Sequence, residues 1–206
     1  MCLNLGGKMG FCFKGLFSRT TKKCCKNCKC KQNNNCKCEY EACEYNTAEQ
    51  IFAPSTGKLI KLSRVKDGIF SKEMLGKGFA VQVGNTGKKD IFAPISGKVN
   101  MVFPTKHALG FASLDNKTQI LLHLGIDTVE LEGKGIEIFV KLNQKIQAGD
   151  KIAAVNLDYL IKSGITNTDI IVIVLNESEY NNFKFLTSPQ REIDTIPFLV
   201  GTSSKS

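Results

Sequence analysis

Short apolar runs of about five to eight residues recur between residues 57 and 175, and they constrain the fold more than any other feature. Glycine, proline, asparagine or aspartate interrupts them, so each run has the length of a strand and a turn at its end. The runs occupy residues 57–63, 78–84, 96–103, 109–114, 118–126, 135–142, 150–157 and 169–175. Only residues 157–164 have a helical pattern, and that segment is short. The sequence therefore predicts an all-β fold, an antiparallel β-sandwich or barrel-like structure with one or two short helices.

An eight-residue unit occurs twice, as IFAPSTGK at residues 51–58 and as IFAPISGK at residues 91–98. In each copy proline restricts φ at a turn, a glycine three residues later allows a positive φ, and a strand follows. A period of forty residues seen only twice is too little for a propeller or a solenoid. The repeat predicts two pseudo-repeated halves of one sandwich, with a common turn sequence as the alternative explanation.

Positive charge and cysteine are concentrated in the first 45 residues. These residues hold nine of the 28 Lys and Arg, three of the 19 Asp and Glu, and all nine cysteines. We therefore divide the chain into a Cys/Lys-rich, low-complexity and disordered extension, 1–45, and a folded domain, 46–206. Most of the excess positive charge lies outside the folded domain, so no nucleic-acid partner is expected. The folded domain needs no disulfides and the chain shows no export signal, which predicts a cytoplasmic protein.

The extension carries two hypotheses, each with a simpler alternative. The spacings Cys25-x2-Cys28 and Cys36-x-Cys38 suit metal ligands, whereas the alternative is a basic linker with incidental cysteines. Residues 9–23 combine large apolar side chains with lysine and arginine, which predicts weak, salt-sensitive contact with the inner face of a membrane. The alternative for residues 9–23 is a solvated tail.

The folded domain contains only two histidines, His107 and His123. Strand alternation puts His123 on the face opposite Leu122, so His123 points outward beside an exposed Leu121 if Leu122 faces the core. A hairpin with its turn at residues 115–116 would pair residues whose numbers sum to about 231. His107 and His123 would then lie nearly opposite each other, about 5 Å apart at Cβ.

The residues around these histidines closely resemble the glucose-type IIA domain of the bacterial phosphoenolpyruvate:sugar phosphotransferase system. Residues 105–108 (TKHA) and 122–131 (LHLGIDTVEL) carry the resemblance, which extends over about residues 48–200. It implies a β-sandwich with a shallow active face and an enzyme, a phosphotransferase with a phosphohistidine intermediate. It also implies the phosphocarrier protein HPr as phosphoryl donor and the IIB domain of a sugar permease as acceptor, with no required cofactor.

The same resemblance implies a role for each matching residue. His123 would accept the phosphoryl group with His107 as its partner, Thr105 would hydrogen-bond His107, and the carbonyl of Gly125 would orient the His123 ring. The apolar docking surface and its acidic edge would comprise Asp67, Ile69, Phe70, Phe103, Leu121 and Asp127. The family usually has valine at the position of Gly68 and often phenylalanine at that of Leu121, so the detailed partner contacts stay open.

A neutral imidazole suits this chemistry, because it is a good nucleophile near pH 7 and leaves readily from phosphorus. A second imidazole that donates a hydrogen bond would stabilise charge on the phosphoryl oxygens in the transition state. An apolar rim would exclude water and limit hydrolysis of the N–P bond.

The same residues leave three alternative functions. A biotinyl or lipoyl carrier of related architecture needs an exposed lysine at a hairpin tip, and the usual Met-Lys-Met sequence is absent. A zinc peptidase needs a third ligand besides His107 and His123. These two histidines are nevertheless candidate ligands of a zinc ion shared with a carboxylate of a partner. The remaining alternative is a non-catalytic regulatory or interaction protein.

Overall fold

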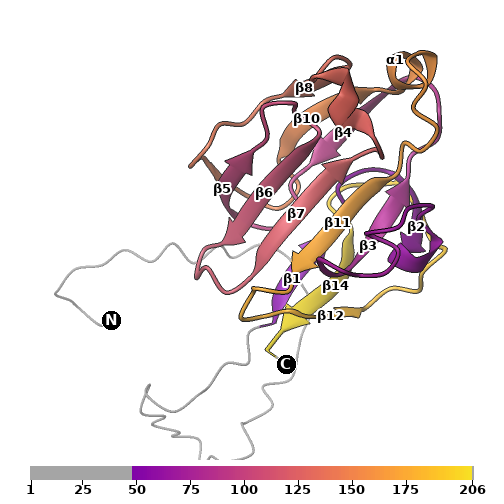
Figure 1. Ribbon diagram of the computed structural model, residues 1–206. Coiled ribbons are helices and arrows are strands. Elements are labelled where there is room, and N and C mark those ends of the chain that lie inside the picture. Colours follow the sequence, from indigo (N-terminus) through magenta and orange to yellow (C-terminus); the bar gives the residue numbers. More distant parts are fainter. Residues whose placement is uncertain (1–47, 206) are drawn as a thin grey trace, which may run out of the picture. The chain divides into compact units, whose positions relative to one another are not determined.

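The computed structural model describes residues 48–205, in which β-strands dominate and α1 (Leu157–Lys162) is the one α-helix (Figure 1). The strands are β1 (Glu49–Phe52), β2 (Gly57–Lys61), β3 (Gly76–Gln82), β4 (Lys88–Phe92), β5 (Gly97–Val102), β6 (Ala108–Ser113), β7 (Gln119–Leu124), β8 (Ile136–Ile138), β9 (Lys145–Ile146), β10 (Lys151–Asn156), β11 (Ile170–Leu175), β12 (Asn182–Phe185), β13 (Glu192–Ile193) and β14 (Leu199–Ser204). Two 3₁₀ turns complete the structure, η1 (Leu62–Arg64) and η2 (Thr128–Leu131).

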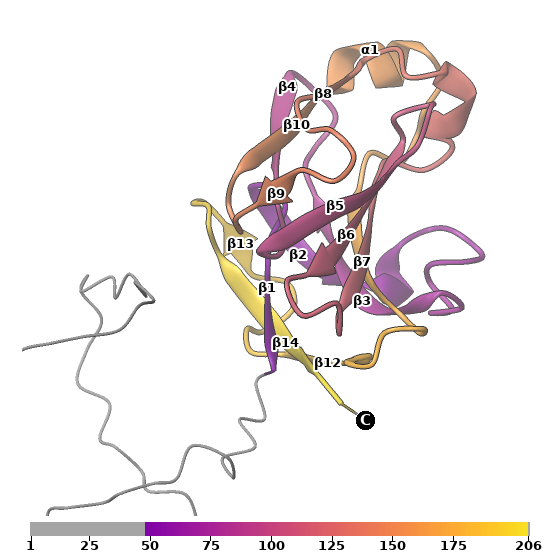
Figure 2. The ribbon, with the colours of Figure 1, turned by 90° about the vertical axis from the view of Figure 1, so that its left-hand side faces the viewer.

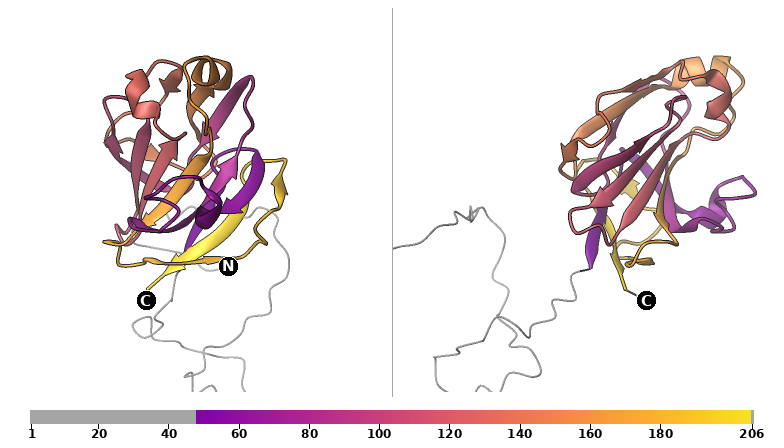
Figure 3. Two further views of the ribbon diagram at one scale, coloured as in Figure 1. Left: turned by 45° about the vertical axis from the view of Figure 1, so that its right-hand side comes forward. Right: turned by 60° about the vertical axis from the view of Figure 1, so that its left-hand side comes forward.

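The strands form one large sheet and two small ones. The large sheet has eight strands in the order β13-β2-β3-β11-β7-β6-β5-β9, and the small sheets are β1-β14-β12 and β4-β10-β8. Figure 2 shows β4, β8 and β10 on the opposite side of the body from β6, β7 and β3, and Figure 3 shows β14 in yellow, crossing the lower end. All the strand pairs in residues 48–205 are antiparallel. The prediction of an antiparallel β-sandwich is therefore confirmed.

The two copies of the repeated unit lie side by side and bond to each other. The backbone N–H of Phe52 donates to Pro94 O at 2.8 Å, and the N–H of Phe92 donates to Pro54 O at 2.7 Å. Equivalent positions of the two copies thus exchange equivalent hydrogen bonds, as two-fold pseudosymmetry requires. The repeat marks related halves of one sandwich, as predicted, and is more than a common turn.

The glycine of each repeat is required by close packing of backbones. A Cβ atom on Gly57 would lie 2.3 Å from Gln82 O, and one on Gly97 would lie 2.0 Å from Ala112 O. Gly57 also has a φ of +143°, whereas Gly97 is not among the residues with positive φ. The prediction that both glycines serve a positive φ is therefore wrong for Gly97, where the neighbouring strand leaves no room for a side chain.

Several strand boundaries differ from those predicted. The run at 57–63 ends as the turn η1, and the run at 135–142 contains only the three-residue strand β8. The sequence pattern missed β1, β4, β9, β12, β13 and β14, which are short or mix polar and apolar residues. The short helix was predicted correctly, and Asn156 caps it by accepting the N–H of Tyr159 at 3.0 Å.

The outer face of the large sheet carries a second apolar cluster. This cluster holds the loop that connects β2 to β3 against the sheet. The alternate residues Ile171 and Ile173 of β11 pack there against Phe70, while Val172 belongs to the main core between the sheets. Strand β11 is consequently buried on both faces. Figure 2 shows the loop, residues 62–75 in purple, projecting from the outer side of the sheet. It brings the segment around Asp67 to the face that bears His123.

No helix within residues 48–205 is long and apolar enough to cross a membrane. The predictions for residues 1–45, disorder, metal binding by the cysteines and membrane contact through residues 9–23, lie outside the described residues and stay predictions.

Candidate active site

The hairpin of β6 and β7 brings the two histidines together. Ala108 pairs with His123, and the N–H of Leu124 donates to His107 O at 2.8 Å, which confirms the predicted register. The centroids of the two imidazole rings are 5.1 Å apart, and the ring planes meet at 65°. The small side chain of Ala108, directly opposite His123, leaves room for the ring. Leu121 lies on the same face as predicted but packs half-buried against the second cluster, so the prediction that it is exposed is wrong.

A single carbonyl group orients the ring of His123. Its Nδ1 lies 2.7 Å from Gly125 O, and because a carbonyl oxygen only accepts, Nδ1 carries the proton. Nε2 is therefore the nitrogen with the free lone pair. Gly125 has a φ of +77°, and a Cβ atom there would lie 2.8 Å from Cγ2 of Thr128. The local geometry thus requires glycine at the position whose carbonyl holds the ring.

Burial keeps the imidazole of His123 neutral. The pKa of His123 is lowered from the ordinary 6.5 to about 4, chiefly by burial and to a smaller extent by the nearby ring of His107. The hydrogen bond to Gly125 and the negative charges of Asp67 and Asp127 act in the opposite direction, but burial outweighs them. At pH 7 the lone pair on Nε2 is consequently available for attack on phosphorus.

His107 is held by a threonine and a phenylalanine. Its Nδ1 lies 2.5 Å from Oγ1 of Thr105, and its ring centroid is 4.9 Å from that of Phe103. Burial lowers the pKa of His107, so this ring is also neutral at pH 7. When the Thr105 hydroxyl donates to Nδ1, the proton of His107 resides on Nε2, where it can be donated to an oxygen atom.

Asp67 organises the loop that carries the predicted docking residues. Its carboxylate accepts the N–H of Phe70 at 2.6 Å, that of Ser71 at 3.0 Å and that of Ile69 at 3.2 Å. Phe70 is only 8% exposed, and its ring centroid lies 4.9 Å from that of His123. Phe70 is therefore a wall of the site, and its role in docking stays a prediction. Ile69, 51% exposed, remains available to a partner.

Of the other predicted edge and docking residues, Asp127 is exposed and Phe103 is half-buried. Asp127 adopts a left-handed conformation, with a φ of +59°, directly before η2. The structure thus places two hydrogen-bonded pairs side by side, Thr105 with His107 and Gly125 with His123, and Phe103 and Phe70 lie against the two rings.

The segment at residues 167–169, which supports the Gly125 turn, was not predicted from the sequence. The N–H of Gly125 donates to Asp169 O at 3.1 Å, and the N–H of Ile126 donates to Asn167 O at 2.9 Å. These contacts use backbone carbonyls, which every residue type has, so no sequence pattern predicts them. Thr128 was also given no role, although it lies within the HLGIDTV segment.

Residues 48–205 contain no group of three or more His, Cys, Asp or Glu side chains that would hold a metal ion by itself. The pair His107 and His123 offers two of the four ligands that zinc usually takes. A zinc ion shared with a carboxylate of a partner stays a prediction.

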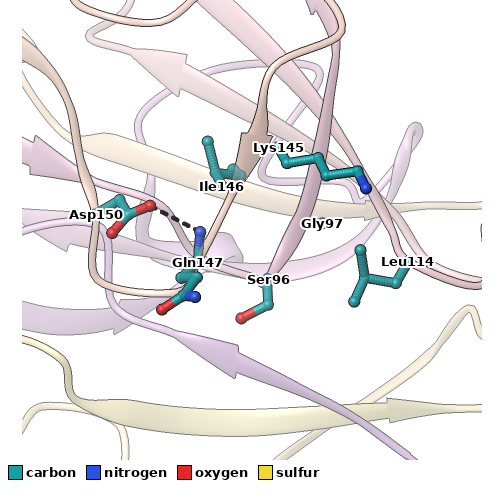
Figure 4. Close-up of a pocket in the computed structure, with 7 residues that line it drawn as sticks. All are labelled: Ser96, Gly97, Leu114, Lys145, Ile146, Gln147 and Asp150. Carbon is teal, nitrogen blue, oxygen red and sulfur yellow. Dashed lines mark hydrogen bonds between the residues drawn. The ribbon is translucent and has the colours of Figure 1, made fainter. Parts of the chain in front are cut away.

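A pocket of about 750 Å³ lies at the β5–β9 edge of the large sheet (Figure 4). Two of its polar side chains already hold the adjacent turn. The Asp150 carboxylate accepts the N–H of Gln147 at 2.8 Å, and Ser96 Oγ accepts the N–H of Ala148 at 3.0 Å. None of the predicted site residues lines this pocket.

Comparisons with known proteins agree with the geometry. Residues 49–180 match the family described as phosphoenolpyruvate-dependent sugar phosphotransferase system, EIIA 1. The glucose-specific EIIA component of Staphylococcus aureus (strain COL) is 38% identical over 127 residues, which cover 58% of this chain and 74% of that protein. The glucoside-specific EIICBA component of Staphylococcus carnosus is 43% identical over 131 residues, 64% of this chain and 18% of that protein.

The fold also matches a solved structure, that of glucose permease IIA from Mycoplasma capricolum. The TM-score is 0.66 at 33% sequence identity, and the match covers 77% of this chain and 97% of the other. The similarity therefore extends over essentially all of that domain.

Proposed function

Because the chain belongs to the EIIA 1 family of the phosphoenolpyruvate-dependent sugar phosphotransferase system and is thus a phosphotransferase component of sugar transport, we propose that His123 carries its phosphoryl group. The observation that carries this proposal is the bond from His123 Nδ1–H to Gly125 O, 2.7 Å long. It fixes the ring by one nitrogen and leaves the other as the nucleophile, beside a second imidazole.

The transfer needs few protein groups. The lone pair of His123 Nε2 attacks phosphorus, the N–P bond of the donor breaks, and its electron pair returns to the donor. No proton has to move, since Nδ1 keeps its hydrogen throughout. The phosphorylated ring gains positive character, and the carbonyl oxygen of Gly125 stabilises it. The nearby carboxylates of Asp67 and Asp127 act in the same sense, because both favour a positive His123.

His107 stabilises the phosphoryl oxygens. Its ring stands 5.1 Å from that of His123, centroid to centroid, which is close enough for Nε2–H to reach a phosphoryl group on His123 Nε2. Thr105 holds His107 by the other nitrogen. The hydrogen bond from His107 stabilises the transition state most, because negative charge then spreads over the three equatorial oxygens of the phosphoryl group. We assign His107 chiefly to the step in which the group leaves His123.

The donor in this proposal is HPr, and the acceptor is the IIB domain of a sugar permease in the cytoplasm. The exposed side chain of Ile69 and the half-buried ring of Phe103 provide an apolar rim that a partner protein would cover. Covering the rim excludes water and protects the N–P bond from hydrolysis. The EIICBA relative is consistent with a IIB acceptor. The comparisons do not favour the carrier or regulatory alternatives.

Labelling from radioactive phospho-HPr tests the proposal, with one variant for each histidine. The wild-type protein should take up label and pass it to a IIB domain. His123→Gln should take up none. His107→Gln should take up label and fail to pass it on. Label on His123→Gln would refute the assignment of the acceptor, and equal loss of both steps in His107→Gln would refute the division of roles.

A further inference from the structure

The orientation of His123 depends on a turn that needs support of its own. Gly125, whose carbonyl accepts the Nδ1–H bond, has a φ of +77° and lies just beyond the end of β7. A glycine peptide in this region rotates at little cost unless neighbouring groups hold it. Backbone bonds to Asp169 O and Asn167 O hold the amide groups on one side of the turn. A side chain within the turn supplies the remaining contacts.

That side chain is Thr128, which is completely buried. Its hydroxyl donates to Leu124 O at 2.7 Å, and Leu124 O belongs to the peptide group directly before Gly125. Its methyl group, Cγ2, lies only 2.8 Å from the position that a Cβ of Gly125 would occupy, so it packs on the Gly125 backbone. Both branches of the threonine thus contact the segment that presents the carbonyl to His123.

We propose that Thr128 is a positioning residue for phosphoryl transfer: it holds the Gly125 turn so that Gly125 O fixes the Nδ1–H tautomer of His123 and leaves Nε2 as the nucleophile. The inference rests on the proposed function, in which His123 Nε2 accepts the phosphoryl group. Thr128 touches neither the phosphoryl group nor the imidazole in this role. It acts only through the peptide groups of Leu124 and Gly125.

Two substitutions distinguish the hydroxyl group of Thr128 from its methyl group. Thr128→Val keeps the shape and the β-branch but removes the hydroxyl, so Leu124 O loses a buried donor. Thr128→Ser keeps the hydroxyl and removes the methyl group. If the hydroxyl holds the turn, the valine variant loses the fixed orientation of His123 and the serine variant retains it. A buried hydroxyl elsewhere provides the control: Ser55, 1% exposed, donates to Asp90 O at 3.0 Å in the turn between β1 and β2.

The tautomer of His123 can be measured without phosphorylation. In the full-length protein labelled with ¹⁵N, the imidazole shifts at pH 7 distinguish a protonated Nδ1 from a protonated Nε2. Wild-type, Thr128→Ser and Ser55→Ala proteins should show Nδ1–H on His123. Thr128→Val should show the two ring nitrogens with converging shifts, as the tautomers mix. Labelling by phospho-HPr should be about tenfold slower in Thr128→Val, the effect of losing one well-placed hydrogen bond, and unchanged in Ser55→Ala.

The two measurements separate this inference from the function on which it rests. A Thr128→Val protein with wild-type shifts and a wild-type labelling rate overturns the inference, as does an equal change in Ser55→Ala. Should Thr128→Val not fold, Thr128→Ala, which adds neither bulk nor a polar group, takes its place under the same criteria. Absence of label on wild-type His123 would overturn the proposed function instead, while the tautomer still decides whether Thr128 holds the ring.

Discussion

The neutral state of His123 should make the protein less stable in acid, and replacing this residue should remove the effect. Burial holds the pKa of His123 at about 4, whereas in the unfolded chain the pKa returns to 6.5. Between pH 4 and pH 6.5 the unfolded chain therefore binds more protons than the folded protein. The stability from this group is fully present above pH 6.5 and decreases as the pH falls toward 4.

The size of the effect follows from the two pKa values. Linkage gives a loss in the free energy of unfolding of about 2 kcal/mol between pH 7 and pH 5, and of about 3 kcal/mol by pH 4. The lowered pKa of His107 acts with the same sign. His123→Gln has no titrating ring in this range, and its amide N–H can still donate to the carbonyl of Gly125. Between pH 7 and pH 5, its free energy of unfolding should therefore decrease by about 2 kcal/mol less than that of the wild-type protein.

Urea denaturation of the two proteins at pH 7, 6 and 5 measures this difference. The wild-type free energy of unfolding minus that of His123→Gln should decrease by about 2 kcal/mol across the series. Subtraction removes the contribution of every other titrating group, His107 included, as long as its pKa is the same in both proteins. A difference that stays constant from pH 7 to pH 5 would refute the conclusion that His123 is held neutral by burial.

Three further predictions concern the turns and the extension. Gly125→Ala should lower the free energy of unfolding by about 2 kcal/mol, because it places a side chain at a left-handed φ and against Thr128. The variant should also fail to accept label from phospho-HPr, and labelling at the wild-type level would contradict the role of this turn. Gly97→Ala, whose Cβ meets a backbone oxygen at 2.0 Å, should reduce the melting temperature far more than Gly68→Ala, where a Cβ meets no atom within 4 Å and φ is not positive; equal effects would argue against the close approach of the strands. If residues 9–23 contact membranes, the full chain should co-sediment with anionic vesicles at low salt but not at high salt, and binding that persists at high salt would indicate a mainly apolar anchor.

The pattern of short apolar runs predicted the sandwich because alternation and turn residues are local properties. It missed strands such as β14, whose LVGTSS sequence becomes a strand only by pairing with β1 and β12 on either side. Tertiary pairing, which no local pattern records, decided the structure there. The repeat at residues 51–58 and 91–98 was the exception, because here a tertiary contact could be predicted from the sequence. Its two copies have nearly the same sequence and hydrogen-bond to each other.

The candidate site was predictable to the extent that it depends on strand register. A turn at residues 115–116 was enough to place His107 beside His123. The roles of Thr105 and Gly125 came from the resemblance to a family, and the structure puts both in hydrogen-bond contact with the rings. The burial of Phe70 was not predictable, because it depends on how a loop folds over the outer face of the sheet.

The most direct test of the account is the chemical identity of the phosphorylated atom. Protein treated with phospho-HPr can be studied by ³¹P and ¹⁵N NMR at alkaline pH, where phosphohistidine survives. The account predicts one phosphoryl group, bonded to Nε2 of His123, with Nδ1 still protonated and donating to Gly125 O. A phosphoryl group on Nδ1 of His123, or on either nitrogen of His107, would contradict it.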